Sequence, residues 1–559
     1  MRKILFFVIV SFVGLAFLSA CGAGAVIPTS PAETSNTKIP LVENTATVAK
    51  ETVIVKETVP VKETVPVVVT ATPSPTPGPK TGGTLILGRT ADIRGLDPHK
   101  QTAISSLRML ELIYDSLLAF DKDMRIVPNL AESWKWSDDG KTLTITLRQN
   151  VKFHNGDVLT SDDVVFSFQR ILDEKTGAVA RANLFDIDKM DASDAATVVF
   201  TMKRPNGAVL STLASPNTAI LSKKLISGGA DPGKQVNGTG PFKFSDWQPG
   251  KSLGLGAFRD YWGTSQPRLD SVEFRLFNDD AALLTALRAK EIQLAMINDT
   301  RVAIRAGADK NLVTMRAPSM DYHVLQLNVG NSIFADVRVR SAISCAIDRQ
   351  EVLIAASLEE GQITSPITAS PYRMAPNDLP CYKLDLDKSK KLLADAKANP
   401  KFKILAPNDE SLTAVTEARN IQLQLARIGI TADVDAVNLN TYFDRWARGE
   451  FEAAIALNSG NPEPDAILYR YWHSTGTLNK ITGFKDPELD KLLDQARTLT
   501  VFSKRKELYD AVQRRLADAS PWIWLYTGYE YRVMLPYVRA FTPMPNGSLI
   551  FLRETWLDN

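Results

Sequence analysis

The sequence predicts an α/β fold from residue 82 to near the C-terminus, because strand and helix patterns alternate along the whole of this region. Strands are indicated by short apolar runs next to glycine and by alternating apolar and polar residues. Helices are indicated by apolar residues spaced three and four apart, behind serine or aspartate caps. An all-helical or an all-β architecture would lack one of these two patterns.

The start of this region supplies a strand, a helix, a hairpin and a second helix. Residues 84–87 form an apolar strand behind two glycines, and residues 107–120 carry a helical pattern. Alternating apolar residues at 143–147 follow the turn at Asp139-Gly140, which predicts a hairpin because glycine readily takes a positive φ. Ser161 then caps a helix with apolar residues on one face.

The remainder of the region continues the alternation. Further strands are expected at residues 198–202, 272–277 and 324–329. Helices are expected at residues 339–356 and 418–428. Another helix begins with Asp486 as its cap and Pro487 at its first position, where the missing proline N–H costs no hydrogen bond. Strands and helices are therefore mixed throughout, as in α/β lobes.

Composition excludes several classes of protein. The chain has 559 residues, 44% hydrophobic and 23% charged, as in an ordinary globular protein of several domains. Loss of Arg2 and Lys3 with a leader would bring the 65 Lys and Arg residues down to the 63 Asp and Glu residues, a formally neutral chain. Neutrality argues against nucleic-acid binding, which relies on neutralising many phosphates. With three cysteines and four histidines, we expect no disulfide framework, metal centre or cofactor.

Residues 1–20 are typical of a bacterial signal peptide. A basic pair precedes an apolar run from residue 4 to 17, which is too short to span a membrane comfortably. The segment ends in Leu18-Ser19-Ala20-Cys21, which looks like a lipobox, so Cys21 is the expected lipid-modified N-terminus. The alternative is a plain secretory signal that contains a cysteine. Lipidation would anchor the protein outside the cytoplasm, at the cell surface or in the periplasm.

Residues 21–80 have no core-forming pattern. The unit Lys-Glu-Thr-Val recurs three times at six-residue spacing from residue 50, and residues 70–79 read TATPSPTPGP. Proline interrupts helices and favours an extended chain. We therefore expect a flexible, neutral tether between the lipid and the folded body.

Several motifs carry a family resemblance. Residues 127–134 read VPNLAESW and residues 147–156 read LRQNVKFHNG. Downstream come GTGPF at 238–242, DYWG at 260–263 and VRVRSAI at 337–343. These segments closely resemble the extracellular solute-binding proteins of family 5, the peptide- and oligopeptide-binding lipoproteins of ABC importers. The resemblance spans about residues 82 to 535, in the family's order.

The resemblance implies a two-lobed periplasmic-binding-protein-like fold of type II, with a hinge that closes the lobes over a solute. The first lobe would comprise residues 81–322 and 522–559, with an extra subdomain at about 120–240. The second lobe would comprise residues 323–521. Both implied crossings, near residues 322–328 and 521–526, read as strands.

The most informative candidate site is the segment 458–465. In the peptide-binding relatives, the matching segment presents an aspartate that pairs with the α-ammonium of the peptide. Here the best-matching position is Asn461, or the aspartate is deleted, and a neutral amide cannot balance a buried ammonium. Glu463 and Asp465 are the candidate replacements, with directions set separately by the prolines before them.

The same segment has lost the aromatic residue that the family places before this site. Asn458 stands there instead. With Ser459, Gly460 and Asn461 it makes the loop rich in amide and hydroxyl groups, which suits uncharged or hydroxyl-bearing solutes. The alternative is that this loop only maintains the fold and that ligand contacts come from elsewhere.

Other candidate ligand contacts lie near the implied crossings and in the first lobe. Asp92 and Arg94 follow the first strand, where relatives contact their ligand. Tyr322 and His323 lie at the first crossing. Trp522 belongs to an aromatic cluster near the second crossing, whose members either pack in the core or line the pocket.

The sequence predicts a binding protein and not an enzyme. Gly250-Lys251-Ser252 lacks the earlier glycine of a phosphate-binding loop, and neither H-E-x-x-H nor C-x-x-C occurs. Sequence leaves open whether Cys345 and Cys381 pair. We expect a monomer that captures a small solute, by family default a peptide, and delivers it to an ABC permease. The alternatives are an oligosaccharide-binding member of the family and a sensory protein that reports solute to a membrane receptor.

Overall fold

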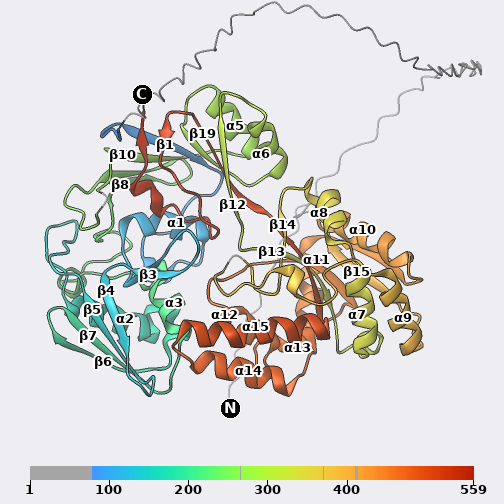
Figure 1. Ribbon diagram of the computed structural model, residues 1–559. Helices are drawn as coiled ribbons and strands as arrows, with labels where there is room; N and C mark the ends of the chain where they lie inside the picture. The colour runs from blue at the N-terminus through green and yellow to red at the C-terminus, as the bar shows by residue number, and fades with distance from the viewer. Residues whose placement is uncertain (1–77, 265, 369, 409–412, 559) are drawn as a thin grey trace, which may run out of the picture. The chain divides into compact units, whose positions relative to one another are not determined.

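The computed structural model describes residues 78–264, 266–368, 370–408 and 413–558. The expected leader, Cys21 and nearly all of the expected tether lie outside the described residues. In the described part, one large sheet forms the centre of each of two lobes, and a smaller sheet forms a subdomain of the first lobe (Figure 1). The predicted α/β fold is confirmed.

The first lobe contains a seven-stranded sheet with helices on both faces. Leu85 and Leu87 point to the face that packs against α1 (Ile104–Ile113), whereas Ile86 contacts the cluster of α5 (Asp280–Arg288) and α6 (Thr300–Gly307). The strands, in spatial order, are β12 (Val313–Pro318), β19 (Tyr529–Met534), β11 (Leu294–Ile297), β1 (Thr84–Arg89), β10 (Ser271–Leu276), β9 (Ser252–Ala257) and β8 (Phe242–Gln248). A small hairpin, β20 (Val538–Arg539) with β21 (Trp556–Leu557), lies near the C-terminus of the chain.

The subdomain contains an antiparallel sheet of four strands covered by a helix. Its order is β4 (Ala131–Trp136), β5 (Thr142–Leu147), β7 (Thr197–Met202) and β6 (Ile187–Asp194). Phe168 of α2 (Ser161–Leu172) meets Phe200 of β7 edge to face, with ring centroids 5.3 Å apart. Shorter elements nearby are β2 (Leu118–Phe120), β3 (Ile126–Pro128), α3 (Val209–Leu213) and α4 (Lys223–Ser227).

The second lobe contains a six-stranded sheet between two groups of helices. Its order is β14 (Gln362–Ile363), β18 (Trp522–Thr527), β13 (Tyr322–Leu327), β17 (Ala453–Asn458), β15 (Lys401–Pro407) and β16 (Thr431–Val437). One face packs against α7 (Val337–Ala346), α8 (Arg349–Ser357), α9 (Leu386–Ala396) and α10 (Ala414–Ala426). The other packs against α12 (Asp465–Trp472), α14 (Pro487–Thr498) and α15 (Phe502–Ala519). The remaining helices are α11 (Leu439–Arg448) and α13 (Asn479–Thr482).

Two adjacent segments join the lobes. β12 leads into β13 through residues 319–321, and β18 leads into β19 through Gly528. The Ser319 N–H donates to the Gly528 carbonyl at 2.9 Å, and the Thr527 hydroxyl lies near the carbonyl oxygens of both Ser319 and Asp321. The expected boundary at residue 522 falls before β18, whose pairing with β13 and β14 places residues 522–527 in the six-stranded sheet.

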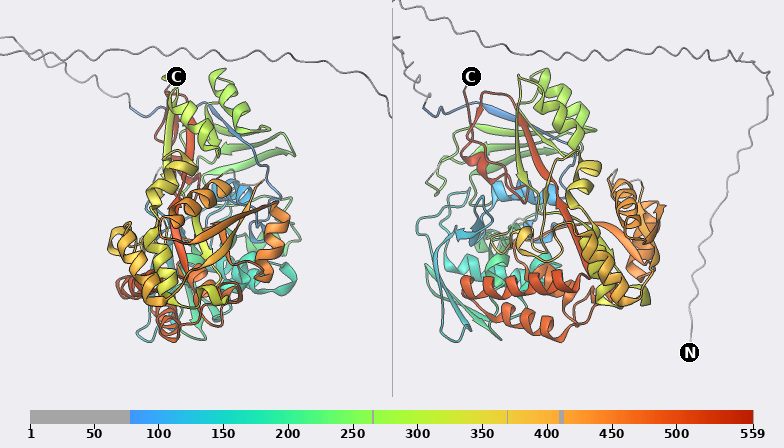
Figure 2. Two further views of the ribbon diagram at one scale, coloured as in Figure 1. Left: turned by 90° about the vertical axis from the view of Figure 1, so that its right-hand side faces the viewer. Right: turned by 45° about the vertical axis from the view of Figure 1, so that its right-hand side comes forward.

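Away from the hinge, the lobes meet where α14 ends beside the subdomain (Figure 2). The Gly207 N–H donates to the Arg497 carbonyl at 2.9 Å. A Cβ atom at position 207 would lie 1.9 Å from the Leu499 carbonyl oxygen, so only glycine permits this approach.

The structure confirms most predicted elements, and it corrects two helices. The helix predicted to run to residue 120 ends at Ile113. The Gly240 N–H donates a hydrogen bond to the Ile113 carbonyl at 2.9 Å, and residues 118–120 form β2. The helix predicted at 339–356 is two helices, because the Asp348 side chain caps a new start by accepting from two backbone N–H groups. The capped start at Asp486-Pro487 is confirmed.

One family motif supplies a histidine that joins its own loop to residues 238–240. The ring of His154, in LRQNVKFHNG, lies with Nε2 3.0 Å from the Gly240 carbonyl, and its Nδ1 accepts from the Gly238 N–H at 3.4 Å. These partners require a neutral ring with its proton on Nε2. Burial lowers the pKa of His154 to about 4, although the hydrogen bond to Gly240 opposes the shift.

We predict that His154 makes the protein less stable as the pH falls from 6.5 to about 4. In this range the unfolded chain takes up a proton on His154 and the folded chain does not, which removes at most roughly 3 kcal/mol. Urea unfolding of wild type and His154→Gln across this range measures the effect. The variant should lose less stability on acidification, and parallel losses would contradict the assignment.

Candidate functional site

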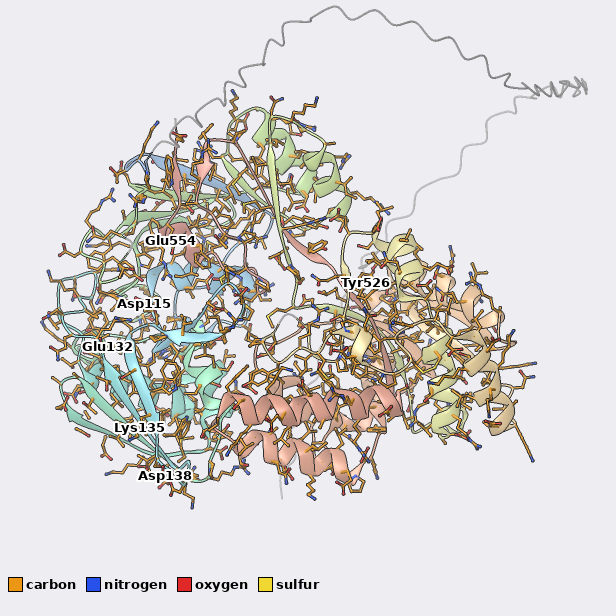
Figure 3. All side chains as sticks on the ribbon, in the orientation of Figure 1. Asp115, Glu132, Lys135, Asp138, Tyr526 and Glu554 are labelled. Atoms are coloured by element: carbon orange, nitrogen blue, oxygen red, sulfur yellow. A yellow bond between two sulfur atoms is a disulfide. The ribbon has the colours of Figure 1, made fainter. Side chains whose placement is uncertain are left out.

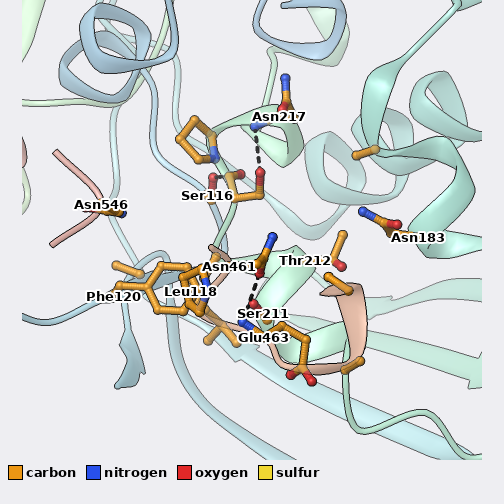
Figure 4. Close-up of a pocket in the computed structure, with 18 of the residues that line it drawn as sticks. Ser116, Leu118, Phe120, Asn183, Ser211, Thr212, Asn217, Asn461, Glu463 and Asn546 are labelled. Carbon is orange, nitrogen blue, oxygen red and sulfur yellow. Dashed lines mark hydrogen bonds between the residues drawn. The ribbon is translucent and has the colours of Figure 1, made fainter. Parts of the chain in front are cut away.

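A cavity of about 510 Å³ lies between the lobes (Figure 4). The first lobe contributes α1 and the residues after it, parts of the subdomain, and the C-terminal segment 544–550. The second lobe contributes residues 461–463, 465 and 466, together with Arg497. A solute in this cavity would therefore contact both lobes at once.

Neutral polar side chains dominate the labelled walls of this cavity. Some already hold the fold: the Asn217 amide donates to two backbone carbonyls, and the Asn461 oxygen accepts from the Glu463 N–H at 2.9 Å. Leu118 and Phe120 add an apolar wall. The neutral polar residues labelled in Figure 4 are Ser116, Asn183, Ser211, Thr212, Asn217, Asn461 and Asn546.

The segment 458–465 lies against the first crossing between the lobes. The Asn458 amide donates to the Tyr322 hydroxyl at 3.4 Å, and the Gly460 N–H donates to Asp321 at 3.3 Å. A Cβ atom at position 460 would lie 2.1 Å from the Met320 carbonyl oxygen, which explains the glycine. Ser459 also hydrogen-bonds Asp321. The hinge therefore positions Asn461 at the cavity wall.

Both candidate replacement anions are already paired with arginines. Glu463 receives two hydrogen bonds from Arg505, at 2.6 and 3.0 Å, with both side chains almost fully buried. Asp465 receives a similar fork from Arg497, at 2.8 to 3.1 Å. Burial raises the pKa of Asp465, and Arg497 opposes that shift. The two pairs neutralise the carboxylates that this loop brings to the cavity.

The candidates of the first lobe lie outside the set of residues that line the cavity. Asp92 accepts from the Gly250 N–H at 2.7 Å and pairs with Arg89 at 3.2 Å, which ties the loop after β1 to the β8–β9 turn. Arg94 is exposed, and its N–H donates to Ser106.

The candidates at the crossings are held within the second lobe. Tyr322 is buried in the aromatic core, and Trp522 packs edge to face on Trp472 with centroids 4.7 Å apart. His323 points to the opposite face of β13, where its Nδ1 lies 2.8 Å from Glu417. It stacks on Tyr526, which is labelled in Figure 3. Of the predicted residues, the cavity brings together Asn461, Glu463 and Asp465.

Sequence reasoning missed the contribution of α1 and of the C-terminal segment. Arg108 and Glu111 line the cavity one helical turn apart, a spacing that marks a shared helix face and could have flagged them. Asn546 and Ser548 reach the cavity from the end of the chain, and no local pattern distinguishes them.

An apolar cavity of about 370 Å³ adjoins the polar one. The two cavities share Phe120, Ser211, Pro462 and Glu463, so they meet at the tip of the second-lobe loop. Its apolar lining comes from the subdomain, through Ile126, Trp134 and Leu210, and from the second lobe, through Tyr372 and through Phe502 at the start of α15.

Comparison with known proteins assigns the family. The model of bacterial extracellular solute-binding proteins, family 5, matches residues 125–479, and the chain belongs to this family. The glutathione-binding protein GsiB of Escherichia coli (strain K12) is 28% identical over 440 residues, which cover 77% of this chain and 86% of GsiB. Di/tripeptide-binding protein 1 of Pseudomonas aeruginosa (strain UCBPP-PA14) is 28% identical over 503 residues, covering 81% and 90%.

A solved structure agrees with the sequence comparisons. The ABC transporter substrate-binding protein CtaP of Listeria monocytogenes superposes with a TM-score of 0.77 at 25% identity, covering 86% of this chain and all of that one. The predicted family and two-lobed fold are therefore confirmed. The protein is an extracytoplasmic solute-binding protein of an ABC transporter system, and this family binds solutes without transforming them.

Within the ranges that the structure describes, no helix has the length and apolarity needed to cross a membrane. In the same part of the chain, no group of three or more His, Cys, Asp or Glu side chains is placed to hold a metal ion. Cys345 and Cys381 form a disulfide.

We predict that Glu463 acts by positioning the loop and not by binding solute charge. Glu463→Gln leaves Arg505 buried without its counter-ion, which should lower the free energy of unfolding by about 3 to 5 kcal/mol. Urea denaturation measures the loss. The control is Glu450→Gln, which removes an exposed partner of Arg448 and should leave the stability close to that of wild type, because solvent screens exposed ion pairs.

The opposite result would show that Glu463 binds the solute. If Glu463→Gln keeps wild-type stability and abolishes solute binding, its carboxylate contacts the solute directly.

Proposed function

We propose that this protein is a membrane-tethered lipoprotein that captures short peptides or closely related solutes between its lobes and delivers them to an ABC permease. Family membership supports the delivery step. The two relatives reported above are named for glutathione and for di- and tripeptides, which supports a peptide-like solute.

The observation that carries the solute class is the junction of the polar and apolar cavities. A peptide has a neutral, hydrogen-bonding backbone and side chains that are often apolar. The polar cavity offers amide and hydroxyl groups to the backbone, and the apolar cavity offers a place for a side chain. Phe120 and Pro462 border both, so one small molecule can occupy both.

The proposed roles of the candidate residues follow from their contacts. Asn461 hydrogen-bonds the solute from the second lobe. Ser459, Gly460 and Asn458 hold that loop to the hinge, and Glu463 and Asp465 fix its far end. The remaining candidates support the cavity walls through the fold: Asp92, Arg94, Tyr322, His323 and Trp522.

The proposed anchor is Cys21, after removal of residues 1–20. The tether would then let the folded body, acting as a monomer, reach the permease from the membrane surface. Neutral lipoproteins of this kind need no further membrane contact, because two or three acyl chains suffice for stable attachment.

An oligosaccharide is the second candidate solute. The observation in its favour is the series of amide and hydroxyl groups on the polar walls, which suit sugar hydroxyls. The apolar cavity favours peptides over this candidate, because a linear sugar has no matching branch.

The solute class can be tested by ligand-induced thermal stabilisation of the full-length chain in detergent. A mixed di- and tripeptide panel should raise the melting temperature, since a ligand at 100 times its Kd adds about 2.7 kcal/mol to the stability of the folded state. A panel of neutral oligosaccharides is the matched alternative. Stabilisation by the sugars alone would replace the peptide proposal with the oligosaccharide one.

A further inference from the structure

The arginines on the cavity wall differ in how many of their donors already hydrogen-bond to carboxylates of the protein. Arg204 donates to Asp186 at 2.8 Å, and Arg497 forms its fork with Asp465. Arg108, on α1, lies 3.9 Å from Glu111 and makes no side-chain hydrogen bond to any residue that the structure describes. Its guanidinium therefore has donors to spare at the cavity wall.

Arg108 is nevertheless sheltered. Its side chain is 11% exposed, beside Glu111 at 12%. Glu111 is itself engaged, because it accepts from the Leu549 N–H at 2.7 Å. Burial raises the pKa of Glu111, and Arg108 and this hydrogen bond oppose the shift. A desolvated guanidinium with a distant partner binds an incoming carboxylate strongly.

The carboxylates that line the described cavity offer no comparable partner to an ammonium group. Glu111 accepts from the Leu549 N–H and also hydrogen-bonds Ser548. Asp186, Glu463 and Asp465 are each paired with an arginine. Asp115 accepts hydrogen bonds from Trp262 and Thr239, both at 3.0 Å, and from Asn129. Position 461, on the opposite lobe, is a neutral amide.

We propose that Arg108 anchors a carboxylate of the solute, so that the protein selects acids over their amides and does not require a free ammonium. This inference rests on the proposed function and narrows it, since a short peptide with a free C-terminus is such an acid. The solute carboxylate would accept hydrogen bonds from the guanidinium of Arg108 on the cavity side, while Asn461 contacts the rest of the solute from the opposite lobe.

The test uses a random tripeptide library in four matched forms: unmodified, C-terminally amidated, N-terminally acetylated, and doubly blocked. Binding to the full-length chain in detergent is followed by thermal stabilisation and by mass spectrometry of retained peptides. Amidation should weaken binding about 10- to 100-fold, the worth of a charged hydrogen-bonding pair, and acetylation should change it less.

Variants assign this effect to one residue. Arg108→Gln should bind the acid and the amide equally, and Arg108→Lys should retain part of the preference, because lysine keeps the charge and loses the fork. Arg288→Gln removes an exposed charge from α5 in the same lobe and should leave the preference intact. Equal melting temperatures without ligand show that the variants are folded.

Each remaining outcome is decisive. If amidation has no effect on wild type, no carboxylate is recognised and the inference fails while the peptide proposal stands. If acetylation abolishes binding, the protein requires a free ammonium, and the inference fails in the same way. If no peptide form binds, the peptide proposal fails. In that case, thermal stabilisation by oligogalacturonides, which are acidic, is compared with stabilisation by neutral oligosaccharides. The inference about Arg108 stands if only the oligogalacturonides stabilise the protein. It fails if the neutral oligosaccharides stabilise the protein, or if neither class does.

Discussion

The rest of the structure depends on the way two strands pass side by side from one sheet to the other. β13 and β18 are neighbours in the second lobe, and β12 and β19 are neighbours in the first. The hydrogen bond between Ser319 and Gly528 ties the crossings together. Because Tyr322 of β13 pairs with Asn458 of β17, the same strands also determine where the segment 458–465 leaves the sheet. The two crossings therefore also position the segment 458–465.

A second constraint is electrostatic. The loop brings two carboxylates toward a closed space, and α14 and α15 supply the arginines that neutralise them. Such buried pairs add little net stability, since the cost of desolvation offsets the attraction, but each residue is costly to remove alone. Their effect is to hold the loop in one conformation and to leave Asn461 as its exposed polar contact. The cavity is thereby polar without carrying free negative charge on this side.

The sequence was sufficient for the family, the α/β fold and most elements, because the signature motifs and caps are local patterns. It was insufficient where a distant residue decides the outcome. The end of α1 depends on Gly240, more than a hundred positions away, and the roles of Glu463 and Asp465 depend on Arg505 and Arg497. The sequence alone predicts that Asn461 replaces the family's aspartate, or that the aspartate is deleted, but the position of α1 across the cavity required the structure.

The arrangement of charge across the cleft narrows what the protein can recognise. In the peptide-binding relatives that the sequence resembles, an anion on the second lobe meets an ammonium. The best-matching position here, Asn461, is an amide, and a buried ammonium facing it would lack compensation at a cost of several kcal/mol. The sheltered charge with spare donors lies instead on the first lobe, at Arg108. A change from an anionic to a cationic anchor moves the recognised end of the solute from its amine to its acid, while the same two-lobed frame and the same hinge are retained.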